Sequence, residues 1–173
     1  YGRIINVSSM GGNFTTPGNG AYHASKYAVE SLTDALRYEV QPFGVDVVSV
    51  QPTGVRTPFV EKLYALMPQT GSDSPYATFK RNIEAQIQQM FSGNAWGILN
   101  PEDVAKEIVQ AVLVRRPQTR YRVGLSGKMF IWVRRLLSDR AWDALMARMF
   151  PMGDVYRSKH RKSLPIRDFS VMK

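Results

Sequence analysis

Tyr22 and Lys26 are the residues whose types and spacing point most directly to chemistry. Residues four apart on a helix lie on the same face, so the ammonium group of Lys26 can approach the phenol of Tyr22. A neighbouring positive charge favours the phenolate form of a tyrosine, and the pair can then exchange a proton near neutral pH. This spacing therefore suggests a general acid/base.

Ser9 precedes Tyr22 by 13 residues and closes an apolar segment. A serine at the carboxyl end of a strand can hydrogen-bond a substrate oxygen while the next helix brings the tyrosine to that oxygen. Gly11 and Gly12 allow the connecting loop to turn without steric cost. We therefore expect Ser9, Tyr22 and Lys26 to form a catalytic centre.

The elements that must position these residues follow the order strand, helix, strand. Residues 3–8 are typical of a short buried strand, and the β-branched run at 45–50 is typical of a parallel strand that is buried on both faces. Apolar residues between them recur at helical steps over 21–40, namely Tyr22, Ala24, Ala28, Val29, Leu32 and Leu36. This βαβ pattern predicts an α/β fold, a Rossmann-like doubly wound parallel sheet, with ligands at the carboxyl ends of its strands.

Further elements follow the Pro52-Thr53-Gly54 break. Residues 58–99 are irregular, with helical pieces at 61–66 and 78–91, and are interpreted as a substrate lid. The run Asn100-Pro101-Glu102-Asp103 is a helix start. Residues 120–125 suggest a last, edge-like strand, and 128–150 suggest two amphipathic helices that meet at 138–139. We divide the chain into 1–125, part of the sheet domain including the lid, and 126–173, basic amphipathic helices and a tail.

Composition excludes several classes of chemistry. The chain has no cysteine and only two histidines, His23 and His160, so thiol catalysis and zinc sites are not expected. It contains no stretch of about 20 apolar residues that could span a membrane, and it begins with neither Met nor a signal peptide. We expect a cytoplasmic protein, with peripheral contact to a membrane as an open alternative.

Positive charge is concentrated near the C-terminus. The net charge is +9, and residues 115–162 hold 13 Lys and Arg against 3 acids. This segment is either a solvated basic surface or a surface that meets anionic lipid. Within it, residues 130–137 place apolar bulk beside two arginines, which suits a membrane interface or a wall of the substrate entrance. No nucleic-acid recognition motif accompanies the charge, so a nucleic-acid partner is not expected.

Three motifs together resemble the short-chain dehydrogenase/reductase family, in its compact NAD(P)-dependent branch. They are GRIINVSS at 2–9, AYHASK at 21–26 and VQPTGVRT at 50–57. The similarity covers residues 1–60 closely and 100–125 more loosely. The resemblance implies an oxidoreductase that moves a hydride between a nicotinamide cofactor, NAD or NADP, and a hydroxyl or carbonyl group.

The resemblance also implies a role for each motif residue. Tyr22 would transfer a proton to or from the substrate oxygen, which Ser9 would hold. Lys26 would assist Tyr22 and hydrogen-bond the nicotinamide ribose. The residues that the resemblance assigns to the cofactor are Tyr22, Lys26, Pro52, Gly54, Val55 and Thr57.

Two features depart from the family pattern. Thr53 stands where the family usually has glycine, and glycine follows one place later at Gly54. The glycine-rich turn that receives the pyrophosphate is not found, and Gly11-Gly12 follows the wrong strand to replace it. We therefore expect the C-terminal part of a longer enzyme, lacking its N-terminal cofactor-binding half and inactive alone.

Substrate and partners are expected as follows. The lid holds the apolar residues Phe59, Leu63, Tyr64, Leu66, Met67, Phe79, Met90, Phe91, Trp96 and Ile98. They suit a hydrophobic alcohol or ketone, and the full protein is expected to be a homo-oligomer. One alternative is a nucleotide-sugar epimerase/dehydratase, where the serine or threonine lies much further before the tyrosine. The other is a non-catalytic NAD(P)-binding module on the same fold.

Overall fold

A parallel sheet of three strands forms the centre of the computed structural model, which describes residues 1–59, 62, 71, 73–74, 76–91 and 97–151. The strands lie in the order β1 (Gly2–Val7), β2 (Val45–Pro52) and β3 (Arg120–Val123). The register pairs Val7 with Val50, and Pro52 with Val123. The carboxyl ends of the strands therefore meet at one edge, as the sequence predicted.

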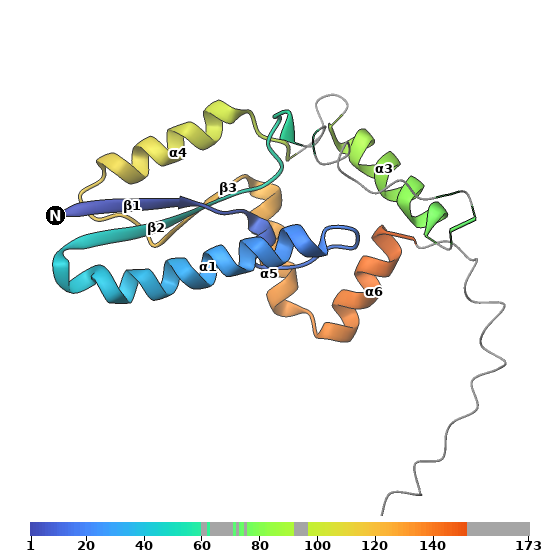
Figure 1. Cartoon of the computed structure of the whole chain (residues 1–173), viewed down its shortest axis with the longest axis horizontal. Helices are drawn as coiled ribbons and strands as arrows, with labels where there is room; N and C mark the ends of the chain where they lie inside the picture. Colours follow the sequence, from blue (N-terminus) through green and yellow to red (C-terminus); the bar gives the residue numbers. More distant parts are fainter. Residues whose placement is uncertain (60–61, 63–70, 72, 75, 92–96, 152–173) are drawn as a thin grey trace, which may run out of the picture.

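Helices cover both faces of this sheet (Figure 1). Helix α1 (Gly20–Val40) lies on one face, and α4 (Pro101–Leu113) lies on the other. Between the sheet and α4 lies a core of buried residues, namely Val48, Val50, Val104, Ala111, Tyr121 and Val123. The doubly wound α/β arrangement is confirmed. Because both faces are covered, β2 is buried along most of its length.

The side of α1 that meets the sheet is polar, which the apolar spacing did not predict. Its buried residues are His23, Glu30 and Thr33. Leu32, which the spacing placed with the packed residues, is instead 69% exposed. The polar face is tolerated because its groups are hydrogen-bonded. Ser49 donates to Glu30 at 2.5 Å, and Asn6 donates to Thr33 at 2.9 Å.

The predicted start of α4 is confirmed. Asn100 and Asp103 form a reciprocal capping box, and Pro101 occupies the first helical turn. Helix α3 (Ala77–Phe91) matches the second expected helical piece of the lid, whereas the piece expected at 61–66 lies almost wholly outside the described residues.

Helices α5 (Leu125–Leu136) and α6 (Asp139–Met149) confirm the predicted pair near the C-terminus. Ser138 caps α6 by accepting a hydrogen bond from the amide of Ala141. The two helices enclose a second core of buried residues, namely Phe14, Ile131, Trp142 and Met146. Across the part of the chain that the structure describes, no helix is both long and apolar enough to cross a bilayer.

Candidate active site

Ser9 lies where β1 ends and the short 3₁₀ helix η1 (Met10–Gly12) begins. Its side chain is held in place because Ser9 Oγ accepts a hydrogen bond from the Gly11 amide at 3.1 Å. Ser9 is only 8% exposed, so this geometry is sheltered from water. A hydroxyl has one donor and two acceptor positions, and the Gly11 contact uses an acceptor. The hydroxyl proton of Ser9 therefore remains available for a substrate oxygen.

Tyr22 and Lys26 lie on the first turns of α1, next to the end of β1. The Lys26 Nζ atom lies 5.8 Å from the centroid of the Tyr22 ring. It also donates a hydrogen bond to the carbonyl of Val7 at 3.3 Å. The expected proximity of the lysine and the tyrosine is therefore confirmed.

Gly11 explains how Ser9 and Tyr22 approach each other. A Cβ atom at Gly11 would lie 3.4 Å from Tyr22 Cε1 and 2.6 Å from His23 Nδ1. The absence of a side chain lets α1 close directly onto the Ser9 loop. Ser9 and Tyr22 thus both contact Gly11. Ser9 accepts a hydrogen bond from the Gly11 amide, and the Tyr22 ring lies near the Gly11 α-carbon.

His23 fastens the Ser9 loop to α1. This buried side chain places Nδ1 at 2.8 Å from the carbonyl of Gly11 and Nε2 at 3.1 Å from Thr16 Oγ1. Both ring nitrogens are therefore used, one at each end of the loop. His23 is therefore a packed residue that is hydrogen-bonded through both ring nitrogens. The sequence could not predict these two hydrogen bonds, because they form only once the loop has folded against α1.

Phe14 anchors the middle of the same loop. It is 2% exposed and packs against Phe130 and Trp142, with ring centroids 5.4 and 5.8 Å away. Helices α5 and α6 therefore also support the loop. The burial of Phe14 was not predicted from the sequence, because an isolated phenylalanine in a glycine-rich loop belongs to no periodic apolar pattern.

The loop after β2 lies at the same edge of the sheet as Ser9. The Thr53 hydroxyl lies 3.2 Å from Ser126 Oγ, and its methyl group contacts the space that a side chain at Gly124 would need. Thr53 thus joins this loop to the start of α5. The residue at the position where the family pattern has glycine thus makes a side-chain contact with α5 in this chain.

The remaining residues of this loop have different surroundings. Pro52 is buried, whereas Thr57 is exposed and its hydroxyl accepts a hydrogen bond from the Phe59 amide at 3.4 Å. Val55 forms a parallel bridge with Leu99. The cofactor contacts expected of Pro52, Gly54, Val55 and Thr57 stay predictions.

The residues present suit the nicotinamide end of a dinucleotide better than its pyrophosphate. An ammonium group has three donors, and Lys26 uses one on Val7, which leaves two for ribose hydroxyls. The amides of Gly11 and Gly12 already donate to Ser9, so they do not form a phosphate cradle. Side chains at these glycines would meet His23 and Glu30, which shows that their role is close packing.

Part of the expected apolar lid can be placed beside this site. The ring of Phe59 lies 5.7 Å from that of Tyr22. Phe91 and Ile98 come so close to Gly54 that a Cβ there would lie 3.4 and 2.7 Å from them. Leu63, Tyr64, Leu66, Met67 and Trp96 lie outside the described residues, as does the side chain of Met90.

A charged cluster holds α1 against β3 below the site. Arg120 pairs with Glu30 at 3.1 Å and with Asp34 at 2.5 Å. Burial disfavours the charge of Arg120, but hydrogen bonds to Asp34 and Glu30 outweigh this effect and raise its pKa. These ion pairs join β3 to α1, the helix that carries Tyr22 and Lys26.

Comparison with known proteins gives consistent results. Residues 1–68 match the family model described as short chain dehydrogenase. An uncharacterized oxidoreductase of Escherichia coli K12, YbbO, is 35% identical over 145 residues, which cover 84% of this chain and 48% of that protein. The NADPH-dependent 3-dehydrocapnine reductase of Ornithobacterium rhinotracheale is 32% identical, with 83% of this chain and 49% of that protein covered. The chain thus spans about half the length of these curated relatives.

A solved structure shares the fold. A short chain dehydrogenase/reductase from Burkholderia phymatum, determined in complex with NAD, superposes with a TM-score of 0.59 at 25% identity. The match covers 77% of this chain and 46% of that one. The arrangement of β-strands and covering helices therefore has a counterpart in a solved dehydrogenase structure.

Proposed function

Because this chain belongs to the short-chain dehydrogenase/reductase family, we propose that it carries the catalytic centre of an NAD(P)-dependent oxidoreductase. The reaction is hydride transfer between the nicotinamide and the carbon of an alcohol or ketone. The observation that carries the proposal is the meeting of Ser9, Tyr22 and Lys26 at the carboxyl edge of the sheet. The name of the Ornithobacterium relative and the NAD complex of the Burkholderia structure support the choice of cofactor.

Tyr22 is the general acid/base of this proposal. In the oxidation direction the substrate hydroxyl gives its proton to the Tyr22 phenolate while its carbon loses a hydride. In reduction the phenol returns that proton to the carbonyl oxygen. Lys26 lies close enough to the ring to stabilise the phenolate by charge. Positioned proton transfer of this kind contributes about 10²–10⁴-fold to rate.

Ser9 holds the substrate oxygen. Its hydroxyl keeps a free proton because the Gly11 amide occupies an acceptor position. A hydrogen bond from a buried donor becomes stronger as the oxygen gains negative charge in the transition state. Gly11 and His23 therefore contribute indirectly, since they fix the direction of the Ser9 hydroxyl.

Lys26 and the loop at 52–57 would hold the cofactor's nicotinamide end. Two donors of Lys26 are available for ribose hydroxyls, while Val55 and Thr57 offer an apolar and a polar contact. When bound there, the nicotinamide accepts or supplies the hydride. The pyrophosphate has no cradle in the loop at 10–12, so the 173 residues alone should bind NAD(H) and NADP(H) weakly or not at all.

The substrate of the proposed reaction is hydrophobic. Phe59 lies against Tyr22, and Phe91 and Ile98 approach the loop at Gly54, so apolar side chains lie beside the tyrosine and beside the proposed cofactor loop. Residues 58–99 then serve as the lid that excludes water from hydride transfer. In this proposal the sheet domain with its lid comprises residues 1–125, and the basic helical part comprises residues 126–173. The active protein is a homo-oligomer.

An activity assay tests the proposal. Protein expressed from the complete reading frame is supplied with NAD or NADP and with two matched sets of secondary alcohols, one long and apolar, the other short and polar. The expected result is reduction of the nicotinamide, followed by its absorbance, with a higher kcat/KM for the apolar set. Tight binding of either cofactor without turnover of any alcohol or ketone would instead favour the non-catalytic module.

A further inference from the structure

Helix α5 exposes a row of large apolar side chains on the face away from the core. They are Leu125, Met129, Trp132 and Leu136, which are 70, 48, 66 and 64% exposed. These positions recur at steps of four, three and four residues, so they form one stripe along the helix. A surface helix usually carries polar residues on this side. A contiguous exposed apolar stripe therefore indicates a surface that meets another apolar phase.

The opposite side of α5 is already occupied. Ile131 is buried in the second core, and Phe130, Val133 and Leu137 pack around it. In the sequence, residues 130–137 form one segment with apolar bulk beside two arginines. In the structure, only Trp132 and Leu136 of this segment belong to the exposed stripe.

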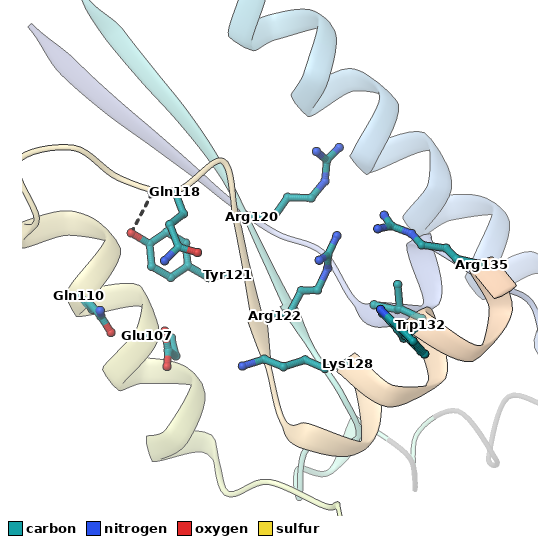
Figure 2. A pocket seen from close by; sticks show the side chains of 10 residues that line it. Glu107, Gln110, Gln118, Arg120, Tyr121, Arg122, Lys128, Trp132 and Arg135 are labelled. Carbon is teal, nitrogen blue, oxygen red and sulfur yellow. Dashed lines mark hydrogen bonds between the residues drawn. The ribbon is translucent and has the colours of Figure 1, made fainter.

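A basic cavity borders the stripe along one side. It has a volume of about 440 Å³ and lies between α4, β3 and α5. Figure 2 shows Arg120 and Arg122 from β3, and Lys128, Trp132 and Arg135 from α5, around this space. Trp132 belongs to both features, so the cavity and the stripe are continuous.

The positive charge at this cavity is not neutralised by the protein around it. Arg120 is paired with acids, but Lys128 and Arg135 form no ion pair with any residue that the structure describes. Glu107 is the only acid in the lining that the structure defines. Burial lowers the pKa of Arg122, and the nearby Arg135 and Arg120 guanidiniums lower it further. Such crowding of like charge is relieved when an anion binds.

We propose that this face of α5 docks on an anionic phospholipid surface. The stripe of Leu125, Met129, Trp132 and Leu136 would enter the interface, with phosphate groups beside Lys128 and Arg135. Each feature matches one layer of a bilayer: apolar side chains for the acyl boundary, tryptophan for the interface, and cations for the headgroups. A second copy of the chain fits less well, because it brings the same uncompensated cations to the contact.

The test is sedimentation of the protein, expressed from its complete reading frame, with two kinds of vesicle. One is phosphatidylcholine alone, and the other is phosphatidylcholine with phosphatidylglycerol. Binding is expected only to the anionic vesicles at low salt, with release as salt rises, because screening shortens to about 10 Å at 0.1 M. The emission of Trp132, isolated as the difference between wild type and Trp132→Phe, should shift to the blue on binding.

Matched variants separate this face from general positive charge. Lys128→Gln/Arg135→Gln should weaken partitioning by roughly 30-fold, since each basic residue at an anionic surface contributes about 1 kcal/mol. Arg115→Gln/Arg116→Gln removes the same charge from exposed positions just after α4 and should change partitioning far less. Leu125→Ser/Leu136→Ser should abolish the Trp132 shift while all basic residues remain.

Three results would overturn the proposal. One is the lack of binding to anionic vesicles at low salt. Another is equal loss of binding in the two charge variants, which would assign the effect to net charge. The third is a dimer that Trp132→Ala dissociates and that does not partition to vesicles, which would assign the stripe to a second copy of the chain.

Discussion

Ser9 and the ring of Tyr22 both lie against Gly11, and this is possible because Gly11 has no side chain. The Gly11 amide orients Ser9, and its α-carbon permits contact with Tyr22. The sequence predicted all three proposed catalytic residues from their types and spacing. It could not predict the function of Gly11, since glycine at this position is equally consistent with an ordinary turn.

Replacing Lys26 by methionine tests the charge effect at the residue scale. An ammonium group beside a phenol stabilises the phenolate, so its loss should lower the rate. The measurement is kcat/KM for Lys26→Met, with Lys106→Met on the far side of the sheet as the control. A normal kcat/KM in Lys26→Met would show that Lys26 does not assist Tyr22.

At the scale of elements, sequence patterns predicted where α4 begins but not which face of α1 is buried. Asn100, Pro101 and Asp103 predicted the start of α4 because a helix end is specified locally. The orientation of α1 was not predictable in the same way. Its buried face is polar, and hydrogen bonds from Asn6 and Ser49 on distant strands make that burial tolerable. Such partners are known only once the fold is formed.

His23→Ala tests whether the clamp between α1 and the Ser9 loop positions the catalytic serine. The change removes the contacts to Gly11 and Thr16, so Ser9 should lose its fixed direction. A misplacement of about 1 Å can reduce rate by up to about 10²-fold, so a fall of this order in kcat is expected with an unchanged pH profile. Kinetics of the purified variant measure both quantities.

His23→Asn serves as the conservative partner in this experiment. Its amide can still reach the Gly11 carbonyl, so it should recover part of kcat. If His23→Ala lost stability but kept wild-type kcat, the clamp would be structural only.

At the scale of the whole molecule, two faces serve different proposed tasks. The carboxyl edge of the sheet gathers Ser9, Tyr22 and Lys26, whereas α5 turns an apolar stripe and basic residues outward. The excess of positive charge at 115–162 is evident from the sequence, but the side of α5 that faces outward is not. That side depends on which face of α5 packs against Phe14, a residue more than a hundred positions earlier in the chain.

The most direct test of the central claim is the rate of hydride transfer in Tyr22→Phe. The variant keeps the ring and its contact with Phe59 but removes the proton carrier. In protein from the complete reading frame, with a substrate that the wild type turns over, single-turnover hydride transfer should fall by about 10²–10⁴-fold while cofactor binding persists. Tyr38→Phe, a 72% exposed position on the same helix, should stay near the wild-type rate. Near-wild-type hydride transfer in Tyr22→Phe would contradict the assignment of the catalytic centre.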